Sequence, residues 1–213
     1  MAMLIPSPQR IQAILFHPKK VWHQIAVEST SLQDLYFGWI LWLAAIPIVC
    51  DVVTDYLMLR GFLGSKAMLY DGYAIPGRII QSAATDYLLE IAMIAILAQM
   101  VMFFSKVCGG QPNLIQATKT VAYAYTPIWL SGTIAPFAAL LAGASPSTPY
   151  FEPTILLGIA VSVAAGCYAI YQAVIGLPIT MHCPSTNTKA RAAAIVVTGI
   201  VATVLLSAIS SKL

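Results

Sequence analysis

Two pairs of acidic residues lie inside strongly apolar stretches of the chain. Asp51 and Asp55 are four positions apart, and so are Asp86 and Glu90. Residues at that spacing share one face of a helix, so each stretch presents two carboxylates on one side if it is helical. Carboxylates within a bilayer are costly unless they pair with cations or line a polar cavity. The spacing therefore indicates an intramembrane polar site for a proton or a cation.

The same carboxylates have a structural alternative. If one member of each pair lies at the headgroup level, only Asp51 and Glu90 reach any depth, and charges near the ends of spans are inexpensive. Carboxylates brought close together do not all ionise unless a cation joins them. The candidate cations are Arg60, Lys66 and Arg78. The spacing alone identifies no ion.

Soft metal donors and catalytic motifs give weaker signals. Cys108, His182 and Cys183 fall near the ends of two apolar stretches, but they are three donors, and a structural zinc site takes four. The sequence contains no G-x-S-x-G, H-E-x-x-H, P-loop or G-x-G-x-x-G motif. We therefore predict no bound metal, no cofactor and no enzymatic activity.

The composition shows which solvent must surround these residues. Of the 213 residues, 59% are hydrophobic and 9% are charged, whereas soluble domains carry about 25% charged residues. The 11 Lys and Arg exceed the 8 Asp and Glu by three, and these charges are scattered rather than gathered in a basic stripe. Lipid is therefore the expected solvent, and nucleic acid is excluded as a partner.

Five apolar runs are long enough to cross a bilayer, which takes about 20 residues. They cover residues 36–59, 87–107, 114–142, 153–181 and 191–210. The predicted fold is thus an all-α membrane protein, with a five-span domain at 33–213 and an N-terminal segment at 1–32. The third and fourth runs exceed one crossing and contain Pro127, Pro136 and Pro178. We expect kinks or breaks in those two helices.

The N-terminal segment has an amphipathic pattern. Its apolar residues recur at helical spacings among basic residues, and they are Ile11, Ile14, Leu15, Trp22 and Ile25. This pattern predicts a helix lying on the inner membrane face. Because proline disfavours a helical conformation in the residue before it, we expect a bend at His17 and Pro18. A cytoplasmic arm with no fixed place is the alternative.

The distribution of Lys and Arg favours one orientation. With the N-terminus inside, seven of these residues lie on the cytoplasmic side: Arg10, Lys19, Lys20, Lys106, Lys119, Lys189 and Arg191. Four lie on the other side: Arg60, Lys66, Arg78 and Lys212. The positive-inside rule therefore predicts a cytoplasmic N-terminus and an outside C-terminus.

Two stripes of small residues recur every four positions. The fourth run contains Gly158, Ser162 and Gly166, and the fifth contains Gly199, Thr203 and Ser207. Small residues let helix backbones approach closely in lipid, where no hydrophobic push between helices exists. We interpret both stripes as helix-packing faces rather than ligand contacts.

Several short stretches, taken in order, resemble one membrane protein family. They are residues 14–22 (ILFHPKKVW), 44–50 (AAIPIVC), 122–132 (AYAYTPIWLSG), 168–171 (YAIY) and 176–178 (GLP). Together they resemble the Yip family of Ypt-interacting membrane proteins, especially its bacterial inner-membrane members. The third stretch is similar to the family's kink motif in the third span, here Tyr123, Tyr125, Thr126 and Pro127.

The resemblance implies a five-span bundle with a cytoplasmic N-terminus, in a bacterial inner membrane. Eukaryotic relatives are associated with Rab-type GTPases, but with only residues 1–32 before the first span we do not expect that partnership here. Two functional hypotheses follow. The first is a non-catalytic scaffold or accessory subunit that binds the lipid bilayer and another membrane protein or itself. The second is a small proton, cation or polar-solute channel or carrier using Asp51 and Glu90.

Overall fold

The computed structural model describes residues 6–70, 74–107, 109–141, 151–183 and 199. Within those residues the chain is helical throughout and contains no strand. The predicted all-α class is therefore confirmed. The predicted fifth span, 191–210, lies outside the described residues apart from residue 199.

Three helical segments are long and apolar enough to cross a membrane. They are Leu32–Leu57, Gly77–Lys106 and Glu152–Thr180. They overlap the predicted first, second and fourth spans, although the second begins at Gly77 rather than at the predicted residue 87. The chain is thus an integral membrane protein with at least these three candidate spans among its described residues.

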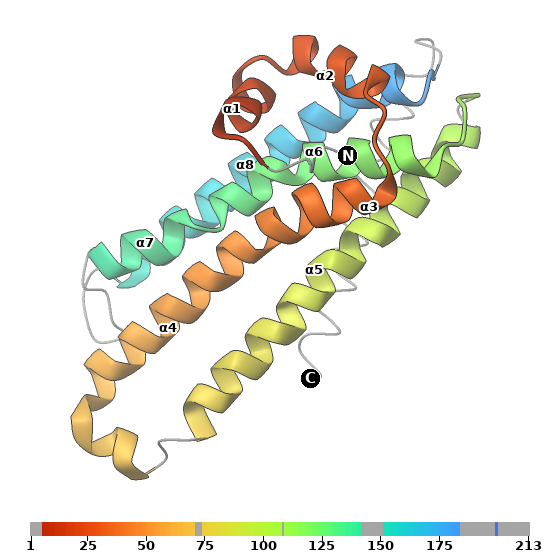
Figure 1. Cartoon of the computed structure of the whole chain (residues 1–213). Helices are drawn as coiled ribbons and strands as arrows, with labels where there is room; N and C mark the ends of the chain where they lie inside the picture. Colours follow the sequence, from red (N-terminus) through yellow and green to blue (C-terminus); the bar gives the residue numbers. More distant parts are fainter. Residues whose placement is uncertain (1–5, 71–73, 108, 142–150, 184–198, 200–213) are drawn as a thin grey trace.

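The first two spans form an antiparallel pair. A single turn, α3 (Leu32–Leu35), leads through a π-helical turn, η1 (Tyr36–Ile40), into α4 (Leu41–Tyr70), and α5 (Ala74–Val107) returns beside it (Figure 1). Ser31 begins this run with a capping box. Its hydroxyl accepts from the Asp34 amide at 3.1 Å, and the Asp34 carboxylate accepts from the Ser31 amide at 3.1 Å. These bonds satisfy amides that the first helical turn leaves free.

The predicted third span is divided into two helices, α6 (Leu114–Ser131) and α7 (Ile134–Leu141). The break lies at Gly132 and Thr133, whereas Pro127 lies within α6. Pro136 explains the position of the break. It is the third residue of α7, and the first four amides of a helix have no intrahelical acceptor, so proline costs no hydrogen bond there.

Glycine at the break also lets two helices approach. A Cβ atom at Gly132 would lie 2.8 Å from Pro47 Cβ on α4, closer than side chains approach one another. The break between α6 and α7 therefore packs directly on α4. α6 also lies along α8 (Phe151–Thr180), and α8 runs without a break through Pro178 to Thr180. The expected break in the fourth run is thus absent.

The N-terminal segment forms two short helices, α1 (Pro8–Phe16) and α2 (Pro18–Val27), which lie against α6 and α8 (Figure 1). Each has a proline as its first residue, where a missing amide costs nothing. His17 joins them. The predicted bend at His17 and Pro18 is confirmed.

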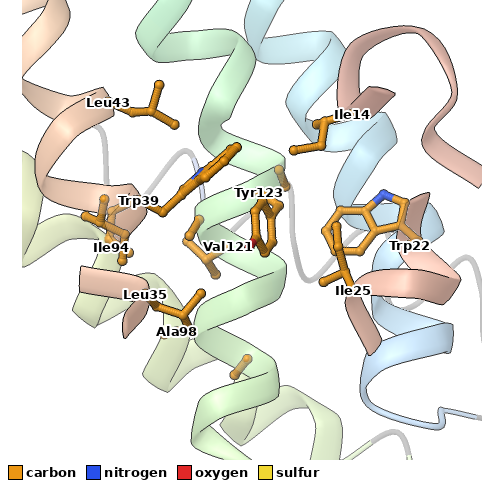
Figure 2. Close-up of a cluster of buried hydrophobic side chains, with 14 of the residues drawn as sticks. Ile14, Trp22, Ile25, Leu35, Trp39, Leu43, Ile94, Ala98, Val121 and Tyr123 are labelled. Atoms are coloured by element: carbon orange, nitrogen blue, oxygen red, sulfur yellow. The ribbon is translucent and has the colours of Figure 1, made fainter. Parts of the chain in front are cut away.

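The apolar stripe of this segment has a different partner from the one predicted. Ile14, Trp22 and Ile25 are each 1% exposed and belong to the protein core rather than facing a membrane. Figure 2 shows the ring of Tyr123 lying between Trp39 on one side and Trp22 and Ile25 on the other. An apolar stripe records that a face is buried, not what covers it. The predicted place of the segment at the inner membrane face stays a prediction.

Candidate functional site: the junction between the N-terminal helices and the bundle

A charged pair joins α1 to the end of α2 and to α6. The guanidinium of Arg10 donates to both carboxylate oxygens of Glu28, at 3.1 and 2.5 Å, and to the Tyr123 hydroxyl at 2.8 Å. It also lies 5.0 Å from the centre of the Tyr123 ring and 5.8 Å from that of Trp39. A bidentate pair beside two aromatic rings is the geometry in which arginine binds best. Arg10 therefore links three helical segments.

The charge of Arg10 is maintained by its partners. Partial burial lowers its pKa, but the hydrogen bond to Glu28 and the interactions with Tyr123 and Glu28 outweigh that effect, so the pKa lies above its usual range. The pair is roughly a quarter to a third exposed, with side-chain exposures of 25% and 30%. The pair between Arg10 and Glu28 therefore orients α1 relative to the end of α2 and does not serve as a proton donor.

Two side chains of α6 bind the carbonyl end of α2. The Lys119 ammonium donates to the carbonyls of Ile25, at 3.2 Å, and of Glu28. The Gln116 amide donates to the Ala26 carbonyl at 3.1 Å. The last carbonyls of a helix have no intrahelical partner and carry partial negative charge, so a cation stabilises them. Lys119, which is 1% exposed, therefore serves as a buried cap for α2.

A second set of bonds joins the N-terminal helices to α8. The Trp22 indole donates to Gln172 Oε1 at 2.8 Å, and Gln172 Nε2 donates to the Ile14 carbonyl at 2.6 Å. The Tyr168 hydroxyl donates to the Leu15 carbonyl. Gly176 makes room for the indole, because a Cβ atom there would lie 2.9 Å from the Trp22 ring. Together these contacts fix α1 and α2 on the bundle.

The four residues of the predicted kink motif have different surroundings in α6. Tyr123 is fully buried and bonded to Arg10, as described above. Thr126 accepts from the Trp39 indole at 3.3 Å and donates to the Ala122 carbonyl at 3.1 Å. Tyr125 packs edge-on against Trp129, with ring centres 5.3 Å apart. Pro127 is buried inside α6, and the chain turns only after Ser131.

The predicted acidic group lies away from the junction, on α4 and α5. Asp51 and Asp55 are exposed, whereas Asp86 and Glu90 are partly buried. Asp55 and Asp86 are close enough to Asp51 to interact with its charge, and Asp86 interacts likewise with Glu90. Glu90 accepts a hydrogen bond from the Trp129 indole at 3.3 Å. Glu90 thus has a structural partner.

Metal donors do not gather in the part of the chain that the structure describes. Among those residues no group of three His, Cys, Asp or Glu side chains is placed to hold a metal ion. Cys183 is buried and His182 is exposed, and Cys108 lies outside the described residues. The acidic group is not a preformed metal cage.

The small-residue stripe of α8 is not the face that packs on α6. The buried residues of that helix are Ala165, Ala169, Gln172, Gly176, Leu177 and Thr180. Ser162 is exposed, Gly158 is partly buried, and a Cβ atom at Gly166 would meet nothing within 4 Å. Gly199 is likewise open, and Thr203 and Ser207 lie outside the described residues.

Most of the junction is not evident from the sequence pattern. Arg10 and Lys119 contribute there only as positive charges that favour one orientation, and the pattern assigns no role to Glu28, Gln116 or Gln172. One signal was available, because Gln172 is a polar residue deep inside an apolar run. Such residues are expensive in a membrane unless they have partners.

Comparison with known families assigns the chain. A model of the Yip1 domain matches residues 13–207. The chain belongs to the Yip family. No curated protein and no solved structure gives a significant match. The matched region begins within α1 and contains α2, α6 and α8, so most of the junction lies inside the Yip1 domain.

Proposed function

We propose that this Yip-family chain is a non-catalytic scaffold or accessory subunit of a membrane complex, and that its junction is the platform a partner binds. One observation carries the proposal: α1 and α2 are held on the bundle by side chains from both α6 and α8, while their outer face remains exposed. Phe16 is 73% exposed and Val27 is 85% exposed on that face.

The polar character of the junction supports a positioning role. Its bonds run from Arg10, Lys119 and Gln172 to fixed acceptors on other segments. Two amphipathic helices could instead lie loosely on lipid through apolar contacts alone. A preorganised surface binds a partner with less loss of conformational freedom than a mobile arm. The junction therefore makes the N-terminal helices a rigid binding surface.

The membrane topology that accompanies this role has five spans, a cytoplasmic N-terminus and an outside C-terminus. Support comes from the apolar run at 191–210, the distribution of Lys and Arg, and the Yip1 match through residue 207. The bacterial inner membrane is the proposed location. Reporter fusions at the two ends test the topology: opposite compartments are expected, and a shared compartment contradicts an odd number of spans.

The stripe of Gly158, Ser162 and Gly166 fits association with a further span. Ser162 is exposed, and the space beside Gly166 is open. Another helix could approach closely there, whether from this chain, a second copy or a partner. The stripe is thus a second contact surface in the proposed complex.

The transport alternative depends on Asp51 and Glu90. The charge interactions of Asp51 with Asp55 and Asp86, and of Glu90 with Asp86, support this alternative. The bond from Trp129 to Glu90 favours a structural role for the deepest member. Flux into proteoliposomes decides the matter. A proton or cation flux that both Asp51→Asn and Glu90→Gln abolish would replace the scaffold proposal with a carrier.

The scaffold proposal is tested by chemical crosslinking in native membranes, followed by purification in mild detergent and mass spectrometry. A stoichiometric membrane partner, or a second copy of this chain, is expected. The yield of the crosslinked complex should fall in Trp22→Ala, because this variant disturbs the junction. It should persist in Trp42→Ala, because the Trp42 side chain on α4 is 61% exposed. A strictly monomeric chain at native abundance would overturn the proposal.

A further inference from the structure

The outer face of α1 and α2 carries positive charge without any counter-charge. The cations of this face, Lys19 and Lys20, are both exposed. Residues 6–27 contain no Asp or Glu. The face therefore differs from an ordinary soluble surface, on which charges of both signs are interspersed.

The acidic residues nearest in the sequence are already engaged. Glu28 binds Arg10 through both carboxylate oxygens. Asp34 accepts from the hydroxyl and the amide of Ser31, at 2.6 and 3.1 Å. Neither carboxylate is free to neutralise Lys19 or Lys20. Among the described residues, no salt bridge joins Lys19 or Lys20 to a carboxylate.

The helix itself does not supply that counter-charge. Lys19 and Lys20 lie in the first turn of α2, where the helix dipole is positive and repels cations. No acidic residue lies in that turn, and no side chain caps it. The lysines are therefore placed where an anion would relieve the repulsion.

The membrane surface is within reach of this face. Only residues 28–31 separate α2 from the candidate span that begins at Leu32. Four residues extend at most about 14 Å, so the end of α2 lies close to the start of that span. Exposed Phe16 and Val27 flank the lysines, a combination typical of helices that lie at the headgroup level.

We propose that the outer face of α1 and α2 binds anionic phospholipid headgroups through Lys19 and Lys20, with Phe16 entering the acyl boundary beside them. The apolar stripe that would otherwise enter lipid is occupied by the protein core, so the contact is made by the opposite face. Lysine is a compact cation that pairs with a phosphate from several directions. This inference rests on the proposed function: lipid covers the part of the outer face that carries Lys19, Lys20 and Phe16, and the partner binds the remainder of that face.

The test measures lipid retention by native mass spectrometry on the full chain, in micelles supplied with equal amounts of phosphatidylglycerol and phosphatidylcholine. Wild type should retain phosphatidylglycerol preferentially, and added salt should reduce that preference. Each surface lysine contributes about a fivefold preference for anionic lipid. Lys20→Gln should therefore lower the ratio about fivefold, and the double variant Lys19→Gln/Lys20→Gln about twenty-fivefold.

Two control variants complete the test. Lys19→Arg/Lys20→Arg keeps both charges and should keep the preference. Arg78→Gln removes an exposed cation at the end of α5 that is far from the junction. This variant should keep most of the preference for phosphatidylglycerol. An equal loss in Arg78→Gln and Lys20→Gln would overturn the proposal, because net charge alone would then explain retention. An unchanged lipid ratio in the double variant Lys19→Gln/Lys20→Gln would also overturn the lipid proposal. In that case, a crosslink from position 24 to an acidic protein would identify that protein as the occupant of this face.

Discussion

The junction and the acidic group are two polar regions in one apolar chain, and they differ in how their polar atoms are satisfied. At the junction, Arg10, Lys119 and Gln172 each bond to specific acceptors on another segment. In the acidic group, Asp51 and Asp55 are exposed on α4, and only Glu90 has a bond from another helix. The first region is built to fix elements in place, and the second is not.

The surroundings magnify this difference. Hydrogen bonds are stronger in an environment of low dielectric constant, and an unpaired polar group is more costly there. The largely paired groups of the junction therefore favour one position of α1 and α2, because moving either helix would leave several buried polar groups without partners. Asp51 and Asp55 lie in the candidate span Leu32–Leu57, where an unpaired carboxylate is itself costly, but these two side chains hold no other helix in place.

The largest effect is expected at Trp22. Trp22→Ala removes a side chain that is 1% exposed and leaves Gln172 Oε1 without its donor. The loss in free energy of unfolding should be about 3–5 kcal/mol. Thermal unfolding in detergent measures it, with Trp42→Ala as the matched control because Trp42 is 61% exposed. Equal losses in the two variants would remove the distinction between the junction and a lipid-facing surface.

A smaller effect separates two glycines of α8. Gly176→Ala places a Cβ atom 2.9 Å from the Trp22 ring, so overpacking should destabilise the fold by about 1–3 kcal/mol. Gly166→Ala meets open space and should gain up to about 1 kcal/mol from helix propensity. The pair is compared by unfolding in the same detergent. A destabilising Gly166→Ala would show that its stripe packs closely in the membrane.

The ion pair should contribute less than the aromatic contact. Glu28→Gln keeps the shape of the side chain but removes the charge, and a pair about a quarter exposed is partly screened by solvent. We expect a loss of about 1 kcal/mol. A double-mutant cycle with Arg10→Gln isolates the coupling between the two side chains. A coupling energy near zero would mean that the bidentate geometry stabilises nothing.

The smallest effect on stability is expected at Asp51. Asp51→Asn removes a charge from the candidate span Leu32–Leu57 without breaking a bond to another helix, so it should not lower the free energy of unfolding. The scaffold account also predicts that proteoliposomes of wild type and of Asp51→Asn show the same background proton flux. If the wild type shows a proton flux that Asp51→Asn abolishes, the acidic group rather than the junction would be the functional region.

Local features of the fold could be predicted from the sequence. The bend at Pro18 follows from the chemistry of proline, and the spans at Leu32–Leu57, Gly77–Lys106 and Glu152–Thr180 follow from length and hydropathy. A break within the third run, 114–142, was expected, but its position at Gly132 and Thr133 was not. It depends on where Pro136 can begin a new helix, and also on Gly132 fitting against Pro47 of another helix.

The junction could not be predicted because its contacts are distant in the sequence. Arg10 and Tyr123 are 113 positions apart, and Trp22 and Gln172 are 150 apart. Periodicity identified Ile14, Trp22 and Ile25 as one face without showing that α6 and α8 cover it. The role of Gly176 is similar, since a glycine beneath an indole is visible only once both helices are placed.

The central claim is that α1 and α2 are fixed on the bundle, and hydrogen–deuterium exchange on the full chain in nanodiscs tests it most directly. The account predicts slow exchange for the hydrogen-bonded amides of 21–27 in wild type, and fast exchange there in Trp22→Ala with α5 unchanged. Fast exchange of that segment in wild type would contradict the account, because a mobile arm cannot serve as a preorganised platform.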